Sequence, residues 1–114
     1  MNFEFYNPTH LIFGAGSLAR LGDAAKRYGQ KALVVTGGGS VKRNGTFDRA
    51  VKSLTAAGLS IAECSGVEPN TRITTVRRGA QIARDEGCDV IVALGGGSVM
   101  DAAKAIAAAV FYDG

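Results

Sequence analysis

The chain has 114 residues, of which 46% are hydrophobic and 20% are charged, a balance typical of one folded domain and too apolar for a disordered segment. The net charge of +3 comes from 13 basic and 10 acidic residues spread along the chain, so there is no concentrated basic face of the kind that binds nucleic acid. Because the chain has neither a long apolar run nor a secretory leader, we expect no nucleic-acid or membrane partner and a cytoplasmic location.

The first expected elements are a strand and a helix. Residues 3–13, FEFYNPTHLIF, are rich in aromatic and β-branched side chains and are broken by Pro8, so they predict one strand or two. After a glycine turn, Ser17 can cap a helix over residues 18–28, whose apolar side chains recur at steps of three and four. Gly29 then ends this helix.

The middle of the chain repeats the order of strand and helix. Residues 31–36 form a short apolar run typical of a buried strand, and the letters GGGS and a polar stretch follow it. Phe47, Val51 and Leu54 then share one face of a helix that ends at Gly58. The run LSIAEC predicts the next strand.

The last part of the chain adds one more strand and two more helices. Asn70 or Thr71 can cap a helix that carries Ile73 on its apolar stripe and ends at Gly87. The run DVIVAL returns to strand, and a second GGGS opens a helix over residues 99–110 that is apolar on nearly every side. We expect such a helix to be covered on more than one face.

Short apolar strands that alternate with helices are typical of a parallel sheet covered by helices. The segment GGGSV occurs at Gly37–Val41 and again at Gly95–Val99, each time directly after a predicted strand. The separation fits two crossover units of about 30 residues each, so both segments should emerge at the same edge of the sheet. The sequence therefore predicts an α/β fold, a Rossmann-like parallel sheet with flanking helices.

The two glycine segments are the main candidates for ligand binding. A glycine run after a parallel strand lets the backbone approach a ligand, and the first amides of the next helix bind anions. The alternative is that the glycines only permit close packing of strand and helix. We favour a phosphate site and assign the pyrophosphate of a dinucleotide to Gly95, Gly96, Gly97 and Ser98. The motif matches neither G-x-G-x-x-G nor the P-loop, so by itself it does not identify the nucleotide.

The first glycine segment differs from a usual NAD site. There a carboxylate at the end of a strand accepts hydrogen bonds from the adenosine ribose, whereas this strand ends in Thr36 and Gly37. We therefore expect this segment, with Ser40, to accept the ribose and its 2′-phosphate. Lys42 and Arg43 are cations for that phosphate or, as an equal alternative, solvated surface residues.

Two polar groups outside the glycine segments are further candidates. Glu68, Pro69 and Asn70 follow the middle strand, where Asn70 either caps a helix or helps to line a ligand site. Asp101 and Lys104 lie three residues apart on the last predicted helix, where they either pair with each other or face a cofactor cleft. We favour the cleft, because that helix has almost no other polar surface.

The chain lacks the residues of a reaction centre. A catalytic zinc or iron site takes about three protein ligands, commonly histidines with a carboxylate, and His10 is the single histidine. Cys64 and Cys88 match no metal-ligand spacing and are expected to be buried, reduced thiols. A G-x-S-x-G nucleophile motif is also absent. We therefore assign no metal ligand and no catalytic residue.

Four stretches taken together resemble a known family: FYNPTHLIFGAG, TGGGSVKRNGTFDRA, SGVEPNTRITTV and ALGGGSVMDAAKAIAA, the last followed by VFYDG. They closely resemble the N-terminal part of iron-containing (group III) alcohol dehydrogenases, especially the butanol dehydrogenase type. The resemblance implies that residues 1–114 form an incomplete NAD(P)-binding domain, the N-terminal half of a two-domain enzyme. The helical domain, absent from this chain, would bind iron or zinc through one aspartate and three histidines.

The resemblance also implies a reaction and an assembly. The full-length enzyme would be a homodimer that interconverts primary alcohols such as butanol and their aldehydes, with a metal that polarises the carbonyl oxygen. Family members with aspartate at position 37 look NAD-selective, so Gly37 favours NADP, with NAD as the alternative. Two other functions stay open: a stand-alone nucleotide-binding regulatory module without catalysis, and another enzyme of the same fold such as a glycerol dehydrogenase.

The implied contacts run along the nucleotide from the adenine to the ribose, the pyrophosphate and the nicotinamide. Glu68, Pro69 and Asn70 would line the adenine side, and Gly37, Gly38 and Ser40 would surround the adenosine ribose. The pyrophosphate would contact Gly95, Gly96, Gly97 and Ser98, and Asp101 would lie near the nicotinamide.

Overall fold

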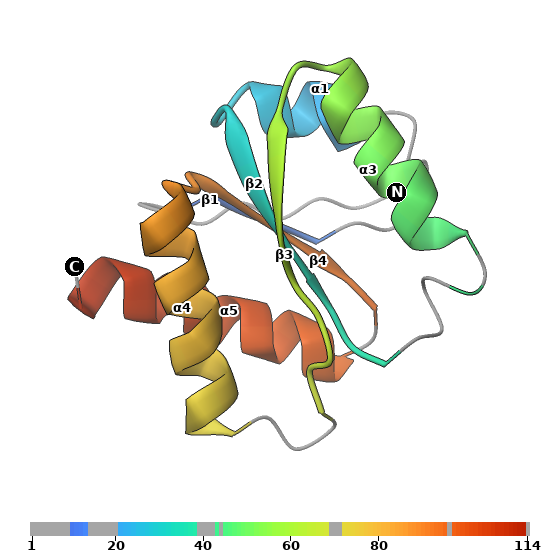
Figure 1. Cartoon of the computed structure of the whole chain (residues 1–114). Helices are drawn as coiled ribbons and strands as arrows, with labels where there is room; N and C mark the ends of the chain where they lie inside the picture. The colour runs from blue at the N-terminus through green and yellow to red at the C-terminus, as the bar shows by residue number, and fades with distance from the viewer. Residues whose placement is uncertain are drawn as a thin grey trace.

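The computed structural model describes residues 10–13, 21–38, 43, 45–68, 72–95 and 97–113 (Figure 1). Strands and helices alternate along them as predicted, in the order β1 (His10–Phe13), α1 (Leu21–Lys26), β2 (Lys31–Thr36), α3 (Thr46–Ala56), β3 (Ser60–Cys64), α4 (Ile73–Glu86), β4 (Val90–Leu94) and α5 (Gly97–Asp113). The break at Pro8 and the cap at Ser17 lie outside the described residues.

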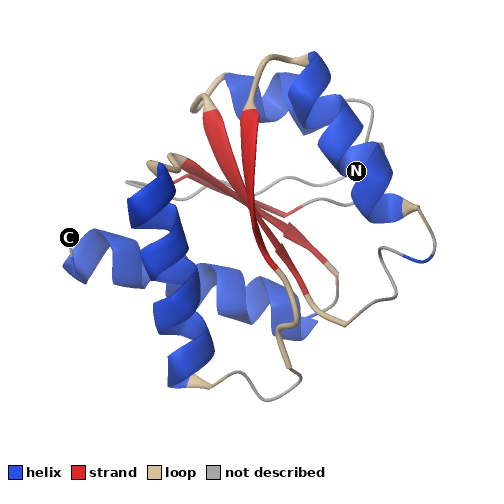
Figure 2. Cartoon of the chain, in the orientation of Figure 1, coloured by secondary structure: helices blue, strands red, loops and turns tan. Residues whose placement is uncertain are grey.

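The described strands form one parallel sheet with the spatial order β1-β4-β2-β3. Helices α1 and α3 cover one face of the sheet, and α4 and α5 cover the other (Figure 2). This arrangement confirms the predicted α/β, Rossmann-like architecture, in which every connection between parallel strands crosses over a face of the sheet.

The apolar runs of the sequence reflect burial of the strands on both faces. Along β2, Leu33 and Val35 pack with α4 and α5, whereas Ala32 and Val34 pack with α1 and α3. All four side chains are 0% exposed. Because successive side chains of a strand point to opposite faces, a sheet covered on both sides needs an unbroken apolar run.

The helix ends agree with the predicted glycine stops and correct one predicted cap. Gly58 and Gly87 follow α3 and α4 with φ angles of 94° and 67°, the left-handed conformation that glycine adopts without strain. The N-cap of α4 is Arg72, so the expectation that Asn70 or Thr71 caps this helix is wrong. The carboxylate of Glu68 takes over that function, as described below.

Helix α5 is covered on more than one side, as predicted. It packs against α4 and against strands β1 and β4. Its buried side chains recur at steps of three and four and form one broad stripe along the helix, and they are Val99, Ala102, Ala103, Ile106 and Ala107. The exposed positions between Gly97 and Val110 include Asp101 and Lys104.

The two cysteines are free and buried, which confirms the expectation from their spacing. Burial raises the pKa of the Cys88 thiol to about 11, so this thiol stays protonated near neutral pH. Separately, within the described ranges no helix has both the length and the apolar character needed to cross a bilayer.

Candidate functional site

The sheet has a point where its connections diverge, between the carboxyl ends of β2 and β4. These strands are neighbours, and Thr36 at the end of β2 pairs with Leu94 at the end of β4. The chain leaves β2 toward α3 on one face and leaves β4 toward α5 on the other. Ligands of open α/β sheets bind at such a divergence. Both glycine segments begin there, which confirms that they share one edge.

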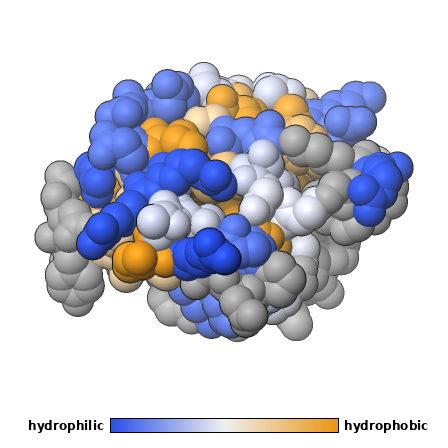
Figure 3. Space-filling model, turned by 60° about the horizontal axis from the view of Figure 1, so that its bottom comes forward, coloured by the Kyte–Doolittle hydropathy of each residue, from blue (hydrophilic) through white to orange (hydrophobic). Residues whose placement is uncertain are grey.

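The edge that carries the carboxyl ends of the strands is viewed in Figure 3. Pale residues of intermediate hydropathy and orange apolar residues lie there among blue hydrophilic ones.

The first glycine segment begins with two residues in different surroundings. Neither Gly37 nor Gly38 has a φ angle in the left-handed region, so their backbone conformation does not require glycine. A Cβ atom at Gly37 would lie 3.1 Å from Val99 Cγ2 and 3.4 Å from the carbonyl oxygen of Val67. A Cβ atom at Gly38 would meet nothing within 4 Å. Position 37 is therefore restricted by space, and position 38 is open.

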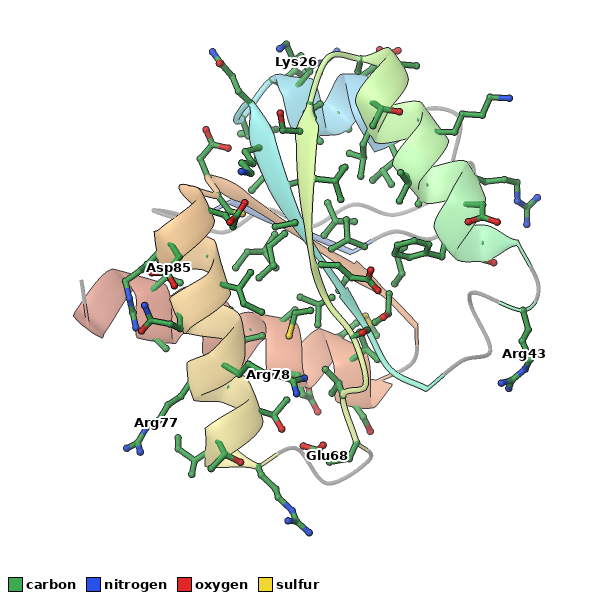
Figure 4. The ribbon with its side chains drawn as sticks, viewed as in Figure 1. Lys26, Arg43, Glu68, Arg77, Arg78 and Asp85 are labelled. Carbon is green, nitrogen blue, oxygen red and sulfur yellow. The ribbon has the colours of Figure 1, made fainter. Side chains whose placement is uncertain are left out.

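Of the candidate polar residues at and just after the first glycine segment, the structure describes only Arg43. Ser40 and Lys42 lie outside the described residues. Arg43 is exposed and extends away from the ribbon, on the side of the molecule where α3 begins (Figure 4). Its position is consistent with the alternative that it is a solvated surface residue.

The second glycine segment leads directly into a long helix. Gly95 has φ 142°, and a Cβ atom there would lie 2.9 Å from Val99 Cγ2, so both conformation and space demand glycine. Gly96 lies outside the described residues. Helix α5 starts at Gly97, which places the half-buried Ser98 inside its first turn.

The start of α5 has the features of an anion site. The first amides of a helix have no partner within the helix, and they lie at the positive end of its dipole. Gly97 is exposed, and a Cβ atom added there would meet nothing within 4 Å, so the backbone is open to a ligand. Asp101 lies one turn further along α5 and is also exposed. The helix start can therefore accept a phosphate group.

The loop after β3 is fixed to the end of β2. The amide of Gly66 donates to the carbonyl oxygen of Gly37 over 3.0 Å, and the amide of Val67 donates to that of Thr36 over 3.1 Å. Arg78 reaches from α4 toward this loop and donates to the carbonyl oxygen of Ser65 over 2.8 Å (Figure 4). These contacts hold the loop beside the first glycine segment.

Glu68 at the end of this loop stabilises the start of α4. Its Oε1 atom accepts hydrogen bonds from the Thr75 hydroxyl over 2.5 Å and from the Arg72 amide over 3.2 Å. Both hydrogen bonds lower the pKa of the Glu68 carboxyl, and the bond from Thr75 has the larger effect. One carboxylate oxygen thus does the work expected of a cap at Asn70 or Thr71. Pro69 and Asn70 lie outside the described residues, so their contacts with an adenine stay a prediction.

Two side chains at this edge were not among the residues predicted from the sequence. Val99, 5% exposed, lies against both Gly37 and Gly95. Thr36 is 0% exposed, and among the described residues its hydroxyl finds no hydrogen-bond partner. A signal for Val99 was present, because a valine ends both GGGSV segments; nothing local distinguished the threonine.

The described part of the chain contains no candidate metal site. There, no three His, Cys, Asp or Glu side chains gather in a way that could hold a metal ion. The described residues thus offer no ligand set for the iron or zinc that the resemblance assigns to a helical domain.

Comparison with known proteins places these features in a family context. The family model described as iron-containing alcohol dehydrogenase matches residues 8–113. A probable NADH-dependent butanol dehydrogenase 2 of Bacillus subtilis is 52% identical over 113 residues, which are 99% of this chain and 29% of that protein. An NADPH-dependent butanol dehydrogenase of Clostridium saccharobutylicum is 41% identical over 110 residues, 96% of this chain and 27% of that protein.

A solved structure agrees with the fold. The crystal structure of NADH-dependent butanol dehydrogenase A from Thermotoga maritima superposes with a TM-score of 0.82 at 41% sequence identity, over 99% of this chain and 29% of that one. The chain studied here thus spans less than a third of the length of the relatives that it matches.

Proposed function

The chain belongs to the iron-containing alcohol dehydrogenase family, and from this premise we propose that it is the nucleotide-binding part of an NAD(P)H-dependent enzyme. The intact enzyme would interconvert primary alcohols such as butanol with their aldehydes. The observation that carries the proposal is the meeting of two glycine segments at the ends of the paired strands β2 and β4.

The proposed nucleotide extends along this edge with its pyrophosphate at the start of α5. Gly95, Gly96, Gly97 and Ser98 would surround the pyrophosphate. The open space around Gly97 and the position of the segment at the start of α5, the positive end of the helix dipole, support this assignment, because they favour close approach of an anion. When bound, the nicotinamide supplies or accepts the hydride of the reaction. Asp101, one helical turn further, is proposed to lie near the nicotinamide.

The adenosine half is proposed to lie at the end of β2 and the loop after β3. Gly37, Gly38 and Ser40 would surround the ribose, and Glu68, Pro69 and Asn70 would line the adenine side. Hydrogen bonds from Gly66 and Val67 to the end of β2 support this grouping, since they hold the two loops together.

We propose that the nucleotide is NADP(H) rather than NAD(H). The end of β2, at Thr36 and Gly37, has no carboxylate that would repel a 2′-phosphate. Four butanol dehydrogenases that are 47–52% identical to this chain are NADH-dependent by name, whereas the NADPH-dependent one is 41% identical. The proposal therefore rests on the absence of a carboxylate at position 37 and not on the relatives.

The remaining parts of the proposal concern the intact enzyme. We propose that iron or zinc is bound by residues other than those described, so this chain contributes nucleotide binding and no step on a metal. The intact enzyme is proposed to be a cytoplasmic homodimer. Two buried, free thiols support a reducing compartment.

The decisive experiment follows NADPH oxidation by the intact protein. We expect protein loaded with iron or zinc to consume NADPH when butanal is added, and calorimetry to detect NADPH binding without butanal. Binding without consumption over a panel of aldehydes would contradict the proposed reaction and favour a regulatory module. Absence of binding of either nucleotide would contradict the nucleotide site itself.

A further inference from the structure

The side chain of Val99 lies between the two glycine segments. It belongs to the first turn of α5, is 5% exposed and packs within the core on the α4 and α5 side of the sheet. Its Cγ2 atom would be 3.1 Å from a Cβ atom at Gly37 and 2.9 Å from one at Gly95. One isopropyl group thus limits the space at the ends of both β2 and β4.

The consequences at the two glycines differ. Gly95 has a φ angle of 142°, so its backbone already excludes other residues. Gly37 has no such restriction, and its contact with Val99 and with the carbonyl oxygen of Val67 is what opposes a side chain there. Because a valine is stiff about χ1 and this one is buried, Val99 has little freedom to move aside.

Position 37 is also where charge would select the nucleotide. A carboxylate at the end of this strand would accept hydrogen bonds from the ribose hydroxyls and would repel a 2′-phosphate. The side chain that would exclude NADPH must therefore begin in the space that Val99 restricts.

From these contacts we propose that Val99 is a specificity-determining residue. Gly37 leaves the end of β2 without a carboxylate, and Val99 restricts how a carboxylate placed at position 37 could reach the ribose hydroxyls. The inference rests on the proposed nucleotide site and deepens it, because it makes nucleotide choice a joint property of positions 37 and 99.

The test is a double-mutant cycle in the intact protein with Gly37→Asp and Val99→Ala. Thermal denaturation gives Tm, and titration with NADPH and with NADH gives the two Kd values. Each single variant is expected to lower Tm by several degrees, through crowding and through a cavity respectively. The decrease in Tm of the double variant is expected to be smaller than the sum of the two single decreases, because the smaller side chain at 99 leaves room for Asp at 37.

Nucleotide choice is the measurement that a purely structural role of Val99 would not change. Compared with Gly37→Asp alone, the double variant is expected to shift the ratio of Kd values toward NADH by a further factor of about ten. Gly38→Asp, with and without Val99→Ala, is the matched control for crowding, since position 38 is open. Its effect on Tm should simply add to that of Val99→Ala.

Three outcomes would overturn the inference. An unchanged ratio between Gly37→Asp and the double variant would show that Val99 does not influence nucleotide choice, while the nucleotide site itself would stand. If Gly37→Asp does not fold and adding Val99→Ala does not restore folding, Val99 is not what opposes a side chain at position 37, and the inference is overturned. Restored folding in the double variant would support it. Wild-type protein that binds neither nucleotide would contradict both the inference and the proposed function.

Discussion

Two buried threonines near the carboxyl edge illustrate how single residues differ in their surroundings. The Thr36 side chain is 0% exposed, and its hydroxyl has no partner within the described residues. Thr75 is 7% exposed, and its hydroxyl donates to the carboxylate of Glu68. A buried polar group without a partner lowers stability, whereas a hydrogen bond to a charged group raises it.

We expect opposite effects when each threonine is replaced by valine, which has almost the same shape. Thr36→Val should raise the free energy of unfolding by about 1 kcal/mol, because it removes a hydroxyl that lacks a partner. Thr75→Val should lower the free energy of unfolding. Urea denaturation of the intact protein measures both changes, and a loss of stability in Thr36→Val would show that this hydroxyl is bonded in the native protein.

The start of α4 shows how one element depends on a residue that precedes it. The first turn has no side-chain cap at Arg72, and Glu68 accepts the Arg72 amide and the Thr75 hydroxyl instead. These bonds lower the pKa of the Glu68 carboxyl in the folded protein. A group of this kind adds stability above its unfolded pKa, and that stability is lost as the pH falls through the unfolded value toward the folded one.

The acid dependence of stability should therefore be weaker in Glu68→Gln than in the wild-type protein. We expect the wild-type Tm to fall more than that of the variant as the pH is lowered from about 6 to about 3, the range in which a glutamate protonates. Circular dichroism at a series of pH values measures this difference. Thr75→Val removes the hydroxyl donor that lowers the pKa of Glu68 most, so it should also weaken the dependence of Tm on pH. Identical curves of Tm against pH for all three proteins would contradict the capping role of Glu68.

At the scale of the whole molecule, the amino and carboxyl ends of the strands differ in their contacts. At the amino edge, the carboxylate of Asp89 accepts the amides of Gln30 and Lys31 over 3.0 to 3.1 Å, and Lys31 pairs with Glu86 over 2.8 Å. At the carboxyl edge lie the glycine segments. Between the edges, α4 and α5 pack closely, since a Cβ atom at Gly79 would collide with the fully buried Ile106.

The contact between these helices gives a prediction about packing. Gly79→Ala should lower the free energy of unfolding by about 1–3 kcal/mol, because overpacking outweighs the better helix propensity of alanine. Ile106→Val alone should cost about 1 kcal/mol. Together the two changes should give a protein more stable than Gly79→Ala alone, since valine lacks Cδ1, the closer of the two colliding atoms, and retains only the Cγ1 contact at 2.8 Å. Urea denaturation measures the cycle, and additive losses would contradict this account of the contact.

Much of the fold could be predicted from local patterns. The order of strands and helices and the stops at Gly58 and Gly87 were confirmed because apolar runs, helical spacing and glycine positions reflect burial and backbone conformation near each residue. The helix caps were predicted less well. Asn70 and Thr71 are good capping residues by type, yet the cap came from a carboxylate in the preceding loop.

The sequence by itself determined that this chain is a parallel α/β domain whose two glycine segments share one edge. Only the tertiary structure decided that β4 lies between β1 and β2, that Val99 fills the space beside Gly37, and that the Thr36 hydroxyl is buried without a partner among the described residues. The physical reason is distance along the chain. A periodic pattern reports which face of an element is buried, whereas the neighbours on that face are set by the pairing of remote segments.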